Sequence, residues 1–287
     1  MMAEYFETCR GRLILGSVII AGVVLSSWIR TANAQPPGTE REERIKKTVV
    51  SIDPSNKKNI SGFVSITNAI GSSLKTPRGV GAGMINLKEA MLKWTKIDTR
   101  VDQQVRLSSP ELFKQPFVYI AFEGGFDLTE SERSNLKQYL ENGGFIVMEQ
   151  FALAKEQDAS GSAFARMMQP VLGSNARVAP LQNSNALYHS FFDFTDGPPI
   201  GGEMKSQVVG STYSQIGGDV KKTDFEISQK AVNYLEGITM NGRLVGICSS
   251  KKYLDKWQER SNNEPQLRMG VNMIVFALTQ QGGMASR

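Results

Sequence analysis

Residues 116–151 read PFVYIAFEGGFDLTESERSNLKQYLENGGFIVMEQF and hold two apolar runs with a helix signal between them. The first run, PFVYIAF, is continuously apolar and rich in β-formers, which is typical of a strand buried on both faces. The second run, FIVM, has the same character. Between the runs, Thr129 and Glu132 match the S/T-x-x-E capping box that begins a helix. Gly143 then ends the helix, because glycine adopts the left-handed conformation at little cost. The order strand, helix, strand predicts a right-handed crossover and parallel pairing.

The sequence before this block predicts a further strand, helix and strand. SGFVSIT (61–67) is expected to be the first strand, and the glycine-rich GVGAGM (79–84) is expected to be a loop. INLKEAMLKWT (85–95) spaces its apolar residues at helical intervals, with the lysines opposite. KIDTRVD (96–102) is expected to be a second, edge-like strand.

The sequence after the block continues in the same style. SAFARMMQPVLG (162–173) predicts a helix that its proline kinks or ends, and ARVAPL (176–181) predicts a weak strand. ITMNGRLVGIC (238–248) predicts a hairpin, because an Asn-Gly pair between two apolar runs fits a type I′ turn. LRMGVNMIVFALTQ (267–280) predicts a closing helix.

The alternation of strands and helices predicts an α/β fold. We expect one large α/β domain that contains parallel strands, with a C-terminal hairpin and helix. Residues 203–230 are polar and weakly patterned. Residues 251–266, KKYLDKWQERSNNEPQ, are expected to be a polar excursion between the hairpin and the last helix.

The first 34 residues match a secretory signal peptide. Residues 13–29 carry no charge, follow two arginines and precede an Ala-Asn-Ala motif that ends at Ala34. A positive flank, an apolar core and small residues before a cleavage point are the three parts of such a signal. We therefore expect cleavage after Ala34 and an exported protein that is periplasmic or extracellular. The alternative is an uncleaved anchor formed by residues 13–29, which would hold the chain at a membrane.

The rest of the chain predicts one domain. Residues 35–58 begin with a polar, Pro/Gly-led stretch and are expected to be a flexible lead-in. Residues 59–281 hold the periodic segments and are long enough for one α/β domain with a sizeable core. Residues 282–287 are expected to be a short tail.

Charge, cysteine and histidine counts exclude several classes of function. The 33 Lys/Arg and 28 Asp/Glu residues give a mildly basic chain whose positive charges are scattered and not interleaved with aromatic residues. We therefore expect no nucleic-acid groove. Cys9 lies in the signal segment, so only Cys248 remains and no intramolecular disulfide forms. With His189 as the only histidine, a zinc site of the usual His/Cys type lacks ligands.

Glu123 and Glu149 each follow a predicted strand. If these strands are neighbours, a spacing of about 4.8 Å between strands brings both carboxylates to one edge of the sheet. The carboxyl ends of parallel strands are where open α/β sheets bind ligands. Paired carboxylates either separate their pKa values for acid/base catalysis or hold a cation. The structural alternative is that each carboxylate caps a helix or lines a polar crevice.

Cys248 lies in a Gly-Ile-Cys-Ser-Ser segment that superficially matches a nucleophile elbow. With His189 it would supply a Cys–His pair for nucleophilic catalysis. Two features speak against catalysis. An elbow requires a helix directly after the nucleophile, and a polar excursion is expected there. Cys248 also falls on the alternating pattern of a hairpin strand, where a free cysteine is usually a small buried hydrophobe.

Three further groups of residues are candidates for ligand contact. In the aromatic segment LYHSFFDF, Asp193 is close enough to orient the His189 imidazole, although a histidine bonded to backbone is the alternative. Asp255 and Trp257 lie in a polar-aromatic stretch that suits sugar or peptide contact, with an ordered surface loop as the alternative. Arg268 lies one helical turn before an asparagine, and both are expected to face the same crevice.

Three blocks of this chain together resemble the bacterial family called domain of unknown function 4159. They are residues 111–151, the segment ALYHSFFDF, and NGRLVGICSSKKYLDKW followed by LRMGVNMIVFALT. The resemblance covers most of residues 60–280. It implies a fold similar to that of class I glutamine amidotransferases, which is a three-layer α/β/α sandwich on a largely parallel sheet. It implies no established activity.

The chain departs from that family pattern at two positions. Relatives usually carry a Gly-His-Gly-type turn where this chain has a Glu-Gly-Gly turn beginning at Glu123. They usually carry paired aspartates where this chain has Glu149 and Gln150. A metal or acid/base role inferred for those family positions therefore does not carry over directly. His189 and Asp193 do match the family's His-Ser-Phe-[Tyr/Phe]-Asp-Phe segment.

These observations lead us to expect a non-catalytic binding module on an amidotransferase-like scaffold, with a small ligand or an envelope protein as its partner. We expect no cofactor and no metal. The ligand-binding candidates are Glu123, Glu149, Gln150, His189, Asp193, Asp255, Trp257 and Arg268. One alternative is an envelope hydrolase that uses Glu123 and Glu149, with or without a divalent cation. Another is a membrane-tethered member of an envelope complex, if residues 13–29 are retained.

Overall fold

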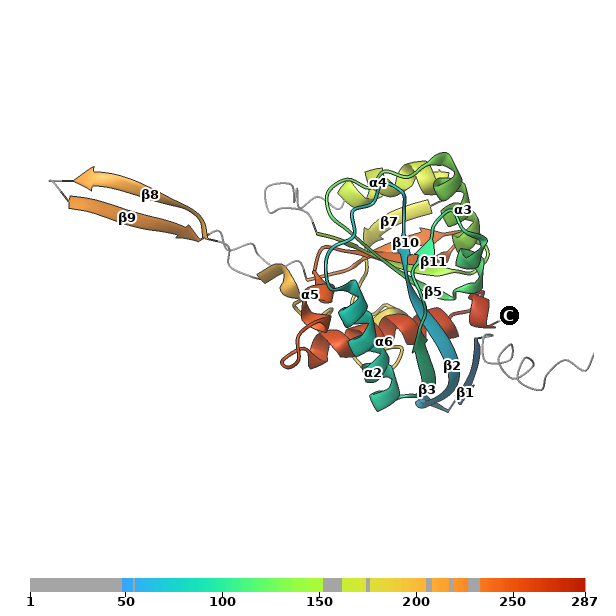
Figure 1. Ribbon diagram of the computed structural model, residues 1–287. Coiled ribbons are helices and arrows are strands. Elements are labelled where there is room, and N and C mark those ends of the chain that lie inside the picture. Colours follow the sequence, from blue (N-terminus) through green and yellow to red (C-terminus); the bar gives the residue numbers. More distant parts are fainter. Residues whose placement is uncertain are drawn as a thin grey trace, which may run out of the picture. The chain divides into compact units, whose positions relative to one another are not determined.

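The computed structural model of the 287-residue chain describes residues 48–53, 55–151, 162–173, 176–204, 208–216, 219–226 and 233–286 (Figure 1). The expected signal peptide and the first part of the expected lead-in, residues 1–47, lie outside the described residues. The structure therefore leaves both expectations as predictions.

A mixed, largely parallel sheet forms the centre of the described fold. Its strands are β1 (Val49–Asp53), β2 (Asn56–Ile70), β3 (Lys96–Val101), β4 (Val105–Arg106), β5 (Phe117–Phe122), β6 (Phe145–Gln150), β7 (Ala176–Pro180), β10 (Glu236–Met240) and β11 (Arg243–Ser249). The order is β1-β2-β5-β6-β11-β10-β7, and β3 and β4 also pair with β2. The pairs that join β2, β5, β6 and β11 are parallel, as are those of β3 and β4 with β2. The outer pairs β1/β2, β10/β11 and β10/β7 are antiparallel.

Helices flank both faces of this sheet. They are α2 (Val80–Trp94), α3 (Glu130–Glu141), α4 (Ser162–Leu172), α5 (Tyr253–Trp257) and α6 (Glu264–Thr279). One core cluster joins one face of the sheet to residues of α2, α5 and α6, and a second cluster joins the opposite face to residues of α3 and α4 (Figure 1). The chain is thus a mixed α/β protein with a largely parallel central sheet, as the sequence predicts.

The structure confirms the two strands, the helix and the parallel pairing predicted for residues 116–151. β5 and β6 pair in parallel with Val118 opposite Ile146, and every residue of β5 is buried. The Thr129 hydroxyl accepts from the Glu132 N–H, and the Glu132 carboxylate accepts from the Thr129 N–H, which completes the capping box. Gly143 follows α3 with φ 91°, in the left-handed region. Local signals alone therefore define this strand–helix–strand unit.

The prediction of a loop at residues 79–84 is wrong, because α2 begins at Val80. Gly79, with φ 86°, takes the left-handed conformation just before the first helical residue. Gly83 lies inside the helix, where an added Cβ would be 2.5 Å from Leu254 Cδ1. Its absent side chain lets α5 approach α2 closely. A glycine-rich sequence here serves helix packing instead of chain flexibility.

The folded chain also begins before the expected boundary at residue 59. Within the expected lead-in, 35–58, Val49–Asp53 form β1 and β2 begins at Asn56. Ser51 pairs with Ser61 across this antiparallel hairpin. β1 is a short edge strand, and its apolar Ile52 is 42% exposed. Its sequence, VVSID, does not alternate between apolar and polar residues as a half-buried strand does, so the pattern did not predict it. The expected strand at 61–67 is confirmed as the inner part of β2.

The C-terminal elements follow the sequence pattern with one correction. Asn241 and Gly242 have φ values of 51° and 80°, as a type I′ turn requires, and they join β10 to β11. The prediction of a polar excursion at residues 251–266 is wrong in part, because α5 lies there. Its apolar residues Tyr253, Leu254 and Trp257 are buried, and the charged residues between them hide this pattern in the sequence.

Two shorter features complete the description. In the weakly patterned stretch 203–230, β8 (Val208–Ile216) and β9 (Asp219–Glu226) form an antiparallel two-stranded sheet of their own. In the expected tail, residues 282–287, Met284–Ser286 form a 3₁₀ turn. The Met284 N–H donates to the Gly143 carbonyl at 3.1 Å, which ties this turn to the end of α3.

Candidate functional site

Glu149 lies at the carboxyl end of β6 and is fully buried. One of its carboxylate oxygens accepts hydrogen bonds from the Tyr253 N–H at 2.7 Å and the Ser249 hydroxyl at 3.1 Å. The other accepts from the Tyr119 hydroxyl at 2.7 Å and the Leu254 N–H at 3.0 Å. An ionised carboxylate has about four acceptor sites. The protein's own donors therefore occupy all of them.

The contacts of Glu149 identify it as a helix cap supplied by a neighbouring strand. Two of its donors are the first N–H groups of α5, which receive no capping bond from the side chain of Lys252 at the N-cap. Burial raises the pKa of Glu149, while the four hydrogen bonds act in the opposite direction. Burial, followed by the nearby Glu149 charge, also raises the pKa of Tyr119 well above its usual value. This arrangement fixes α5 on the sheet.

The other two polar residues at this edge have separate partners. Glu123 follows the end of β5, pairs its carboxylate with Lys75, and is 35% exposed at its side chain. The Gln150 amide donates to the Gly124 carbonyl at 3.1 Å. Since Glu123 faces Lys75 and Glu149 faces α5, these contacts do not favour a hydrolase that works through a carboxylate pair.

Cys248 lies on β11 and is buried in the core cluster that joins the sheet to α3 and α4. Burial, and then the nearby charge of Glu236, raises the pKa of this thiol well above its usual value. The expectation that a polar excursion follows Cys248 is wrong, because α5 begins at Tyr253. α5 packs on the opposite face of the sheet, however. Burial of the thiol, and not a missing helix, is what opposes a nucleophilic role.

His189, Asp193 and Lys57 form a surface cluster. The His189 Nδ1 lies 3.3 Å from Asp193 Oδ1, and its Nε2 lies 2.8 Å from the Asn183 carbonyl oxygen. Lys57 of β2 donates to the same Asp193 oxygen at 2.6 Å and to the His189 carbonyl at 3.1 Å. The hydrogen bond from Lys57 is the main reason why the pKa of Asp193 is lowered. The imidazole therefore links Asp193 to the turn that contains Asn183.

Asn272 of α6 forms hydrogen bonds with the aromatic segment LYHSFFDF, residues 187–194, which carries His189. It is fully buried, and its amide donates to the carbonyls of Leu187 at 3.1 Å and Phe192 at 2.8 Å. Its side-chain oxygen accepts from the Phe192 N–H at 2.8 Å, and its carbonyl accepts from the Ser190 hydroxyl at 2.8 Å. Arg268 lies one turn earlier, with its guanidinium carbon 5.0 Å from the centre of the Phe192 ring. Both residues thus position the segment that carries His189.

Trp257 and Asp255 take up different positions on α5. The Trp257 ring is fully buried, lies 5.4 Å from the Tyr119 ring, and donates from its indole N–H to the Gln266 carbonyl at 2.9 Å. It belongs to the core and does not face solvent. Asp255 lies in the first turn of α5, beside Gly202, where an added Cβ would be 2.8 Å from the Asp255 Cβ.

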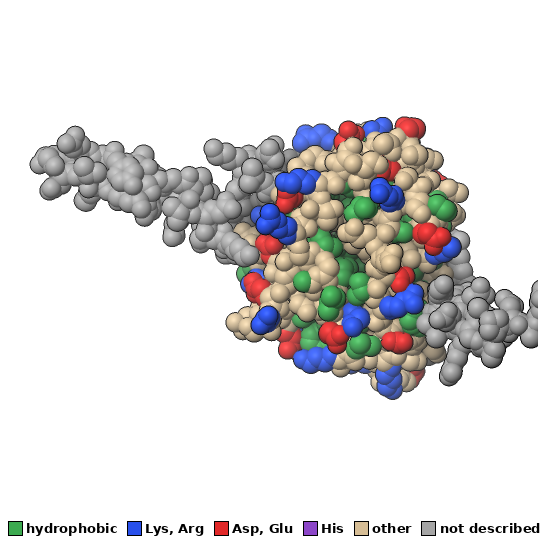
Figure 2. Space-filling view, viewed as in Figure 1, with side chains coloured by type: hydrophobic (Ala, Val, Ile, Leu, Met, Phe, Trp, Pro, Cys, Tyr) green, Lys and Arg blue, Asp and Glu red, His purple; other side chains and the backbone are tan. Residues whose placement is uncertain are grey.

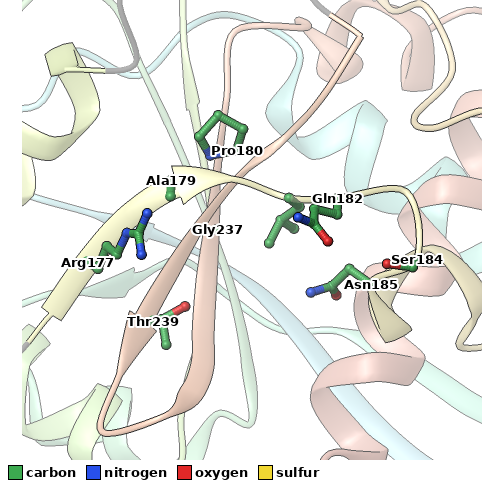
Figure 3. Close-up of a pocket in the computed structure, with 9 residues that line it drawn as sticks. Arg177, Ala179, Pro180, Gln182, Ser184, Asn185, Gly237 and Thr239 are labelled. Atoms are coloured by element: carbon green, nitrogen blue, oxygen red, sulfur yellow. The ribbon is translucent and has the colours of Figure 1, made fainter.

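An open pocket lies over β7 and β10 (Figure 3). Its volume of about 410 Å³ falls in the range of small-ligand sites. It is lined by Arg177, Ala179, Pro180, Leu181, Gln182, Ser184, Asn185, Gly237 and Thr239. Arg177 and Thr239 lie on one side in Figure 3, with Gln182 and Asn185 on the other. None of the eight residues proposed from sequence lines this pocket.

The pairing of β7 with β10 forms the floor of this pocket. Arg177 pairs with Thr239 and Ala179 pairs with Gly237, so all four side-chain positions share one face of the β7/β10 pair. Gly237 has no side chain, and a Cβ there would be 2.3 Å from Leu181 Cδ2. Leu181 can therefore lie directly on the strand at the edge of the pocket.

The His189 cluster and the pocket share one turn. Gln182, Ser184 and Asn185 supply the polar wall of the pocket. The backbone carbonyl of Asn183, in the same turn, accepts from the His189 imidazole at 2.8 Å. At the end of the turn, the Asn185 side chain accepts from the Leu187 N–H at 3.0 Å. His189 thus contacts the pocket wall from behind and acts as a positioning residue for it.

Sequence reasoning missed the residues that line the pocket. They come from the weak strand at 176–181, from the turn after it, and from β10, which is distant in sequence. One signal was available, the Gln-Asn-Ser-Asn run at 182–185. Amide and hydroxyl side chains of this kind favour turns that bond their own backbone. No local sequence pattern predicts that β7 pairs with β10.

Glu236, at the start of β10, should make the protein's stability depend on pH. Burial raises the pKa of this carboxyl from 4.5 to about 7, and its Oε1 is buried without a hydrogen-bond partner among the described residues. The folded state favours the neutral form of this carboxyl. Its contribution to the stability of the folded state is therefore complete below pH 4.5 and is lost as the pH rises to about 7. We expect the free energy of unfolding of Glu236→Gln to exceed that of wild type by about 1–2 kcal/mol at pH 8 and to equal it at pH 4. Urea denaturation at both pH values measures this. An equal difference at the two pH values would contradict it.

The described residues carry few other signs of chemistry. They contain no group of three or more His, Cys, Asp or Glu side chains placed to hold a metal ion. Within the same residues, no helix is both long and apolar enough to cross a bilayer. On the face seen in Figure 2, basic and acidic side chains are interspersed and the basic ones do not form a stripe.

Comparison with known proteins places the chain in a family. The family model described as Domain of unknown function (DUF4159) matches residues 75–278, from just before α2 to the end of α6. No curated protein sequence matches the chain. The matched range contains both the Glu149 cap and the residues of the pocket. The chain therefore belongs to the DUF4159 family.

Proposed function

We propose that this protein is a non-catalytic binding module and that the pocket over β7 and β10 is its ligand site. A contrast between two parts of the molecule carries the proposal. The pocket is open and lined by polar side chains. Two of the candidate groups for chemistry are closed off, because Glu149 is saturated by four donors and Cys248 is buried in the core.

The lining of the pocket supports a ligand with a carboxylate or amide beside a short apolar part. Arg177 presents a guanidinium, which recognises carboxylates through two parallel hydrogen bonds. The neutral polar side chains of Gln182, Ser184, Asn185 and Thr239 can fix the orientation of an amide. Ala179 and Leu181 add a small apolar floor. A peptide side chain or a small acyl amino acid has this chemistry.

We also propose that the scaffold is the amidotransferase-like three-layer sandwich and that the protein is exported to the cell envelope. Helices on both faces of a largely parallel sheet support the first part. The charge and apolar pattern of residues 1–34 supports the second part. Mass spectrometry of the mature chain tests export. A first residue at Gln35 is expected, and an intact residue 1 would contradict cleavage.

Filling the pocket should weaken binding strongly. We expect the capped dipeptide acetyl-Glu-Val-amide to bind the full chain with a dissociation constant on the order of 1 mM and acetyl-Lys-Val-amide to bind more weakly. Ala179→Phe places a ring on the floor between Arg177 and Gly237 and should weaken acetyl-Glu-Val-amide binding at least tenfold. Ligand-observed NMR measures both constants.

Two further variants make this test specific. Ser134→Phe adds the same ring to an exposed position on α3, on the other face of the sheet, and should leave binding unchanged. His189→Ala removes the bond to Asn183 and should weaken binding several-fold without filling the pocket. The proposal fails if Ala179→Phe binds the dipeptide as wild type does. It also fails if the protein turns over a substrate in a reaction that Cys248→Ala or Glu123→Gln abolishes.

A further inference from the structure

β7 is the last strand in the sheet order among the described residues, so one of its edges lacks a neighbouring strand. On its inner side, the Leu181 N–H donates to the Leu235 carbonyl at 2.8 Å. Residues of an antiparallel pair alternate between bonded and non-bonded positions. Arg177 and Ala179 therefore bond to β10 as well, and Val178 turns its N–H and C=O toward the open edge.

Pockets lie on both faces of this edge strand. The pocket of Figure 3 lies on the face that carries Arg177 and Ala179. A second pocket of about 410 Å³ lies on the other side, between β7 and α4, and is lined by Ala165, Arg166, Met168, Gln169, Leu172, Gly173, Ala176, Arg177 and Val178. The side chains of Ala176 and Val178 pack on that face. An extended peptide paired with β7 would send alternate side chains toward the two pockets.

The two pockets differ in chemistry. The first is lined by amide and hydroxyl side chains and by Arg177. The second has the apolar side chains of Met168, Leu172 and Val178 at its base. It is bordered by Arg166, by Gln169 and by Arg177, which lines both pockets. Neither lining includes an aspartate or glutamate. The pair therefore suits a strand in which acidic residues alternate with apolar ones.

We propose that the open edge of β7 binds an extended peptide segment by strand addition, with acidic side chains in the Arg177 pocket and apolar side chains in the α4 pocket. Main-chain hydrogen bonds to Val178 would supply affinity, and the two pockets would supply sequence preference. This inference rests on the proposed binding function and specifies its ligand class. It goes further in assigning a role to the strand edge and to the second pocket.

Pro180 sets one limit of the pairing. It occupies an outward-bonding position on the same edge as Val178, where its nitrogen carries no hydrogen. An added strand can therefore bond around Val178 but loses a donor at Pro180. A proline at this place also opposes uncontrolled edge-to-edge pairing between copies of the chain. The edge thus accepts a short segment instead of a long strand.

The experiment uses capped hexapeptides of alternating sequence and the full chain. The acidic probe is acetyl-(Glu-Val)₃-amide and its control is acetyl-(Lys-Val)₃-amide. Two further acidic probes carry N-methyl groups on all three Glu nitrogens or on all three Val nitrogens. Only every second residue of a paired strand faces its neighbour. One methylated isomer should therefore lose binding at least tenfold, while the other keeps it.

Two protein variants complete the design. Val178→Pro removes the outward N–H without removing a bond to β10, and it should weaken binding of the acidic hexapeptide at least tenfold. Arg177→Glu should reverse the preference, so that the Lys-Val peptide binds more tightly than the Glu-Val peptide. The methylated peptides keep the test valid even if Val178→Pro disturbs the fold.

The outcomes separate this inference from the proposed function. Isomer-dependent binding together with a reversed preference in Arg177→Glu supports strand addition. Equal binding of both methylated isomers overturns it. If acetyl-Glu-Val-amide binds in a manner that Ala179→Phe blocks, and the hexapeptide gains nothing over the dipeptide, the pocket function stands and the edge pairing is wrong. If no hexapeptide binds, the strand-addition proposal is overturned.

Discussion

Glu149→Leu is expected to lower the free energy of unfolding by about 5 kcal/mol, because it leaves four buried donors without an acceptor. Two of them are the first N–H groups of α5, at Tyr253 and Leu254, and the others are the hydroxyls of Tyr119 and Ser249. Each unsatisfied buried donor costs about 1–3 kcal/mol, and partial rearrangement keeps the sum below the maximum. Urea denaturation followed by circular dichroism measures the loss.

Two controls separate a structural role for Glu149 from a catalytic one. Glu149→Gln keeps one acceptor oxygen and should cost about half as much as Glu149→Leu. Glu123→Gln removes only a partly exposed ion pair with Lys75 and should change stability by less than about 0.5 kcal/mol. If Glu149→Leu unfolded with nearly wild-type free energy, the capping role would be wrong and Glu149 would again be a candidate for chemistry.

Asn272→Leu is expected to lower the free energy of unfolding by about 3–4 kcal/mol and to make the segment that carries His189 more mobile. It leaves the Phe192 N–H and the carbonyls of Leu187 and Phe192 without their side-chain partner in the core. The amide hydrogen of Phe192 should then exchange with solvent much faster than in wild type. Denaturation and hydrogen exchange together measure both effects.

The matched control for Asn272 is Ser190→Ala. It removes one hydroxyl that bonds the Asn272 carbonyl at 2.8 Å and should cost about 1 kcal/mol. Binding of acetyl-Glu-Val-amide should fall in Asn272→Leu, as is expected for His189→Ala, since Asn272 positions the segment whose His189 bonds to the Asn183 carbonyl. A stable Asn272→Leu protein with slow exchange at Phe192 would contradict the anchoring role.

Local signals predict the central part of the fold well. The capping box at Thr129 and Glu132, the stop at Gly143 and the Asn241-Gly242 turn each form as expected. Each depends on residues within a few positions of one another, so tertiary contacts are not needed to decide them. The parallel pairing of β5 with β6 follows from the helix between them.

The misses have tertiary causes. The glycines of residues 79–84 suggest a loop, yet they begin α2, because Gly83 makes room for Leu254 of α5. α5 itself is hidden, because two charged residues, Asp255 and Lys256, separate the buried pair Tyr253 and Leu254 from Trp257. In both places contacts between segments distant in sequence override the local preference.

The candidate site was predictable only in part. The proximity of Asp193 to the His189 imidazole and the position of Glu149 at the end of its strand follow from sequence pattern, and the structure places them so. The partners of Glu149 do not follow from pattern, since its four donors come from β5, β11 and α5. The pocket does not follow either, because its floor depends on the pairing of β7 with β10.

The most direct test of the binding function is a titration of the ¹⁵N-labelled full chain with acetyl-Glu-Val-amide, followed by amide chemical shifts. The binding account predicts saturable shifts at Arg177, Ala179, Gly237, Thr239 and the turn at 182–185, with Glu149 and Cys248 unaffected. Saturable shifts centred on Glu149 and Cys248, with none at the pocket, would contradict it.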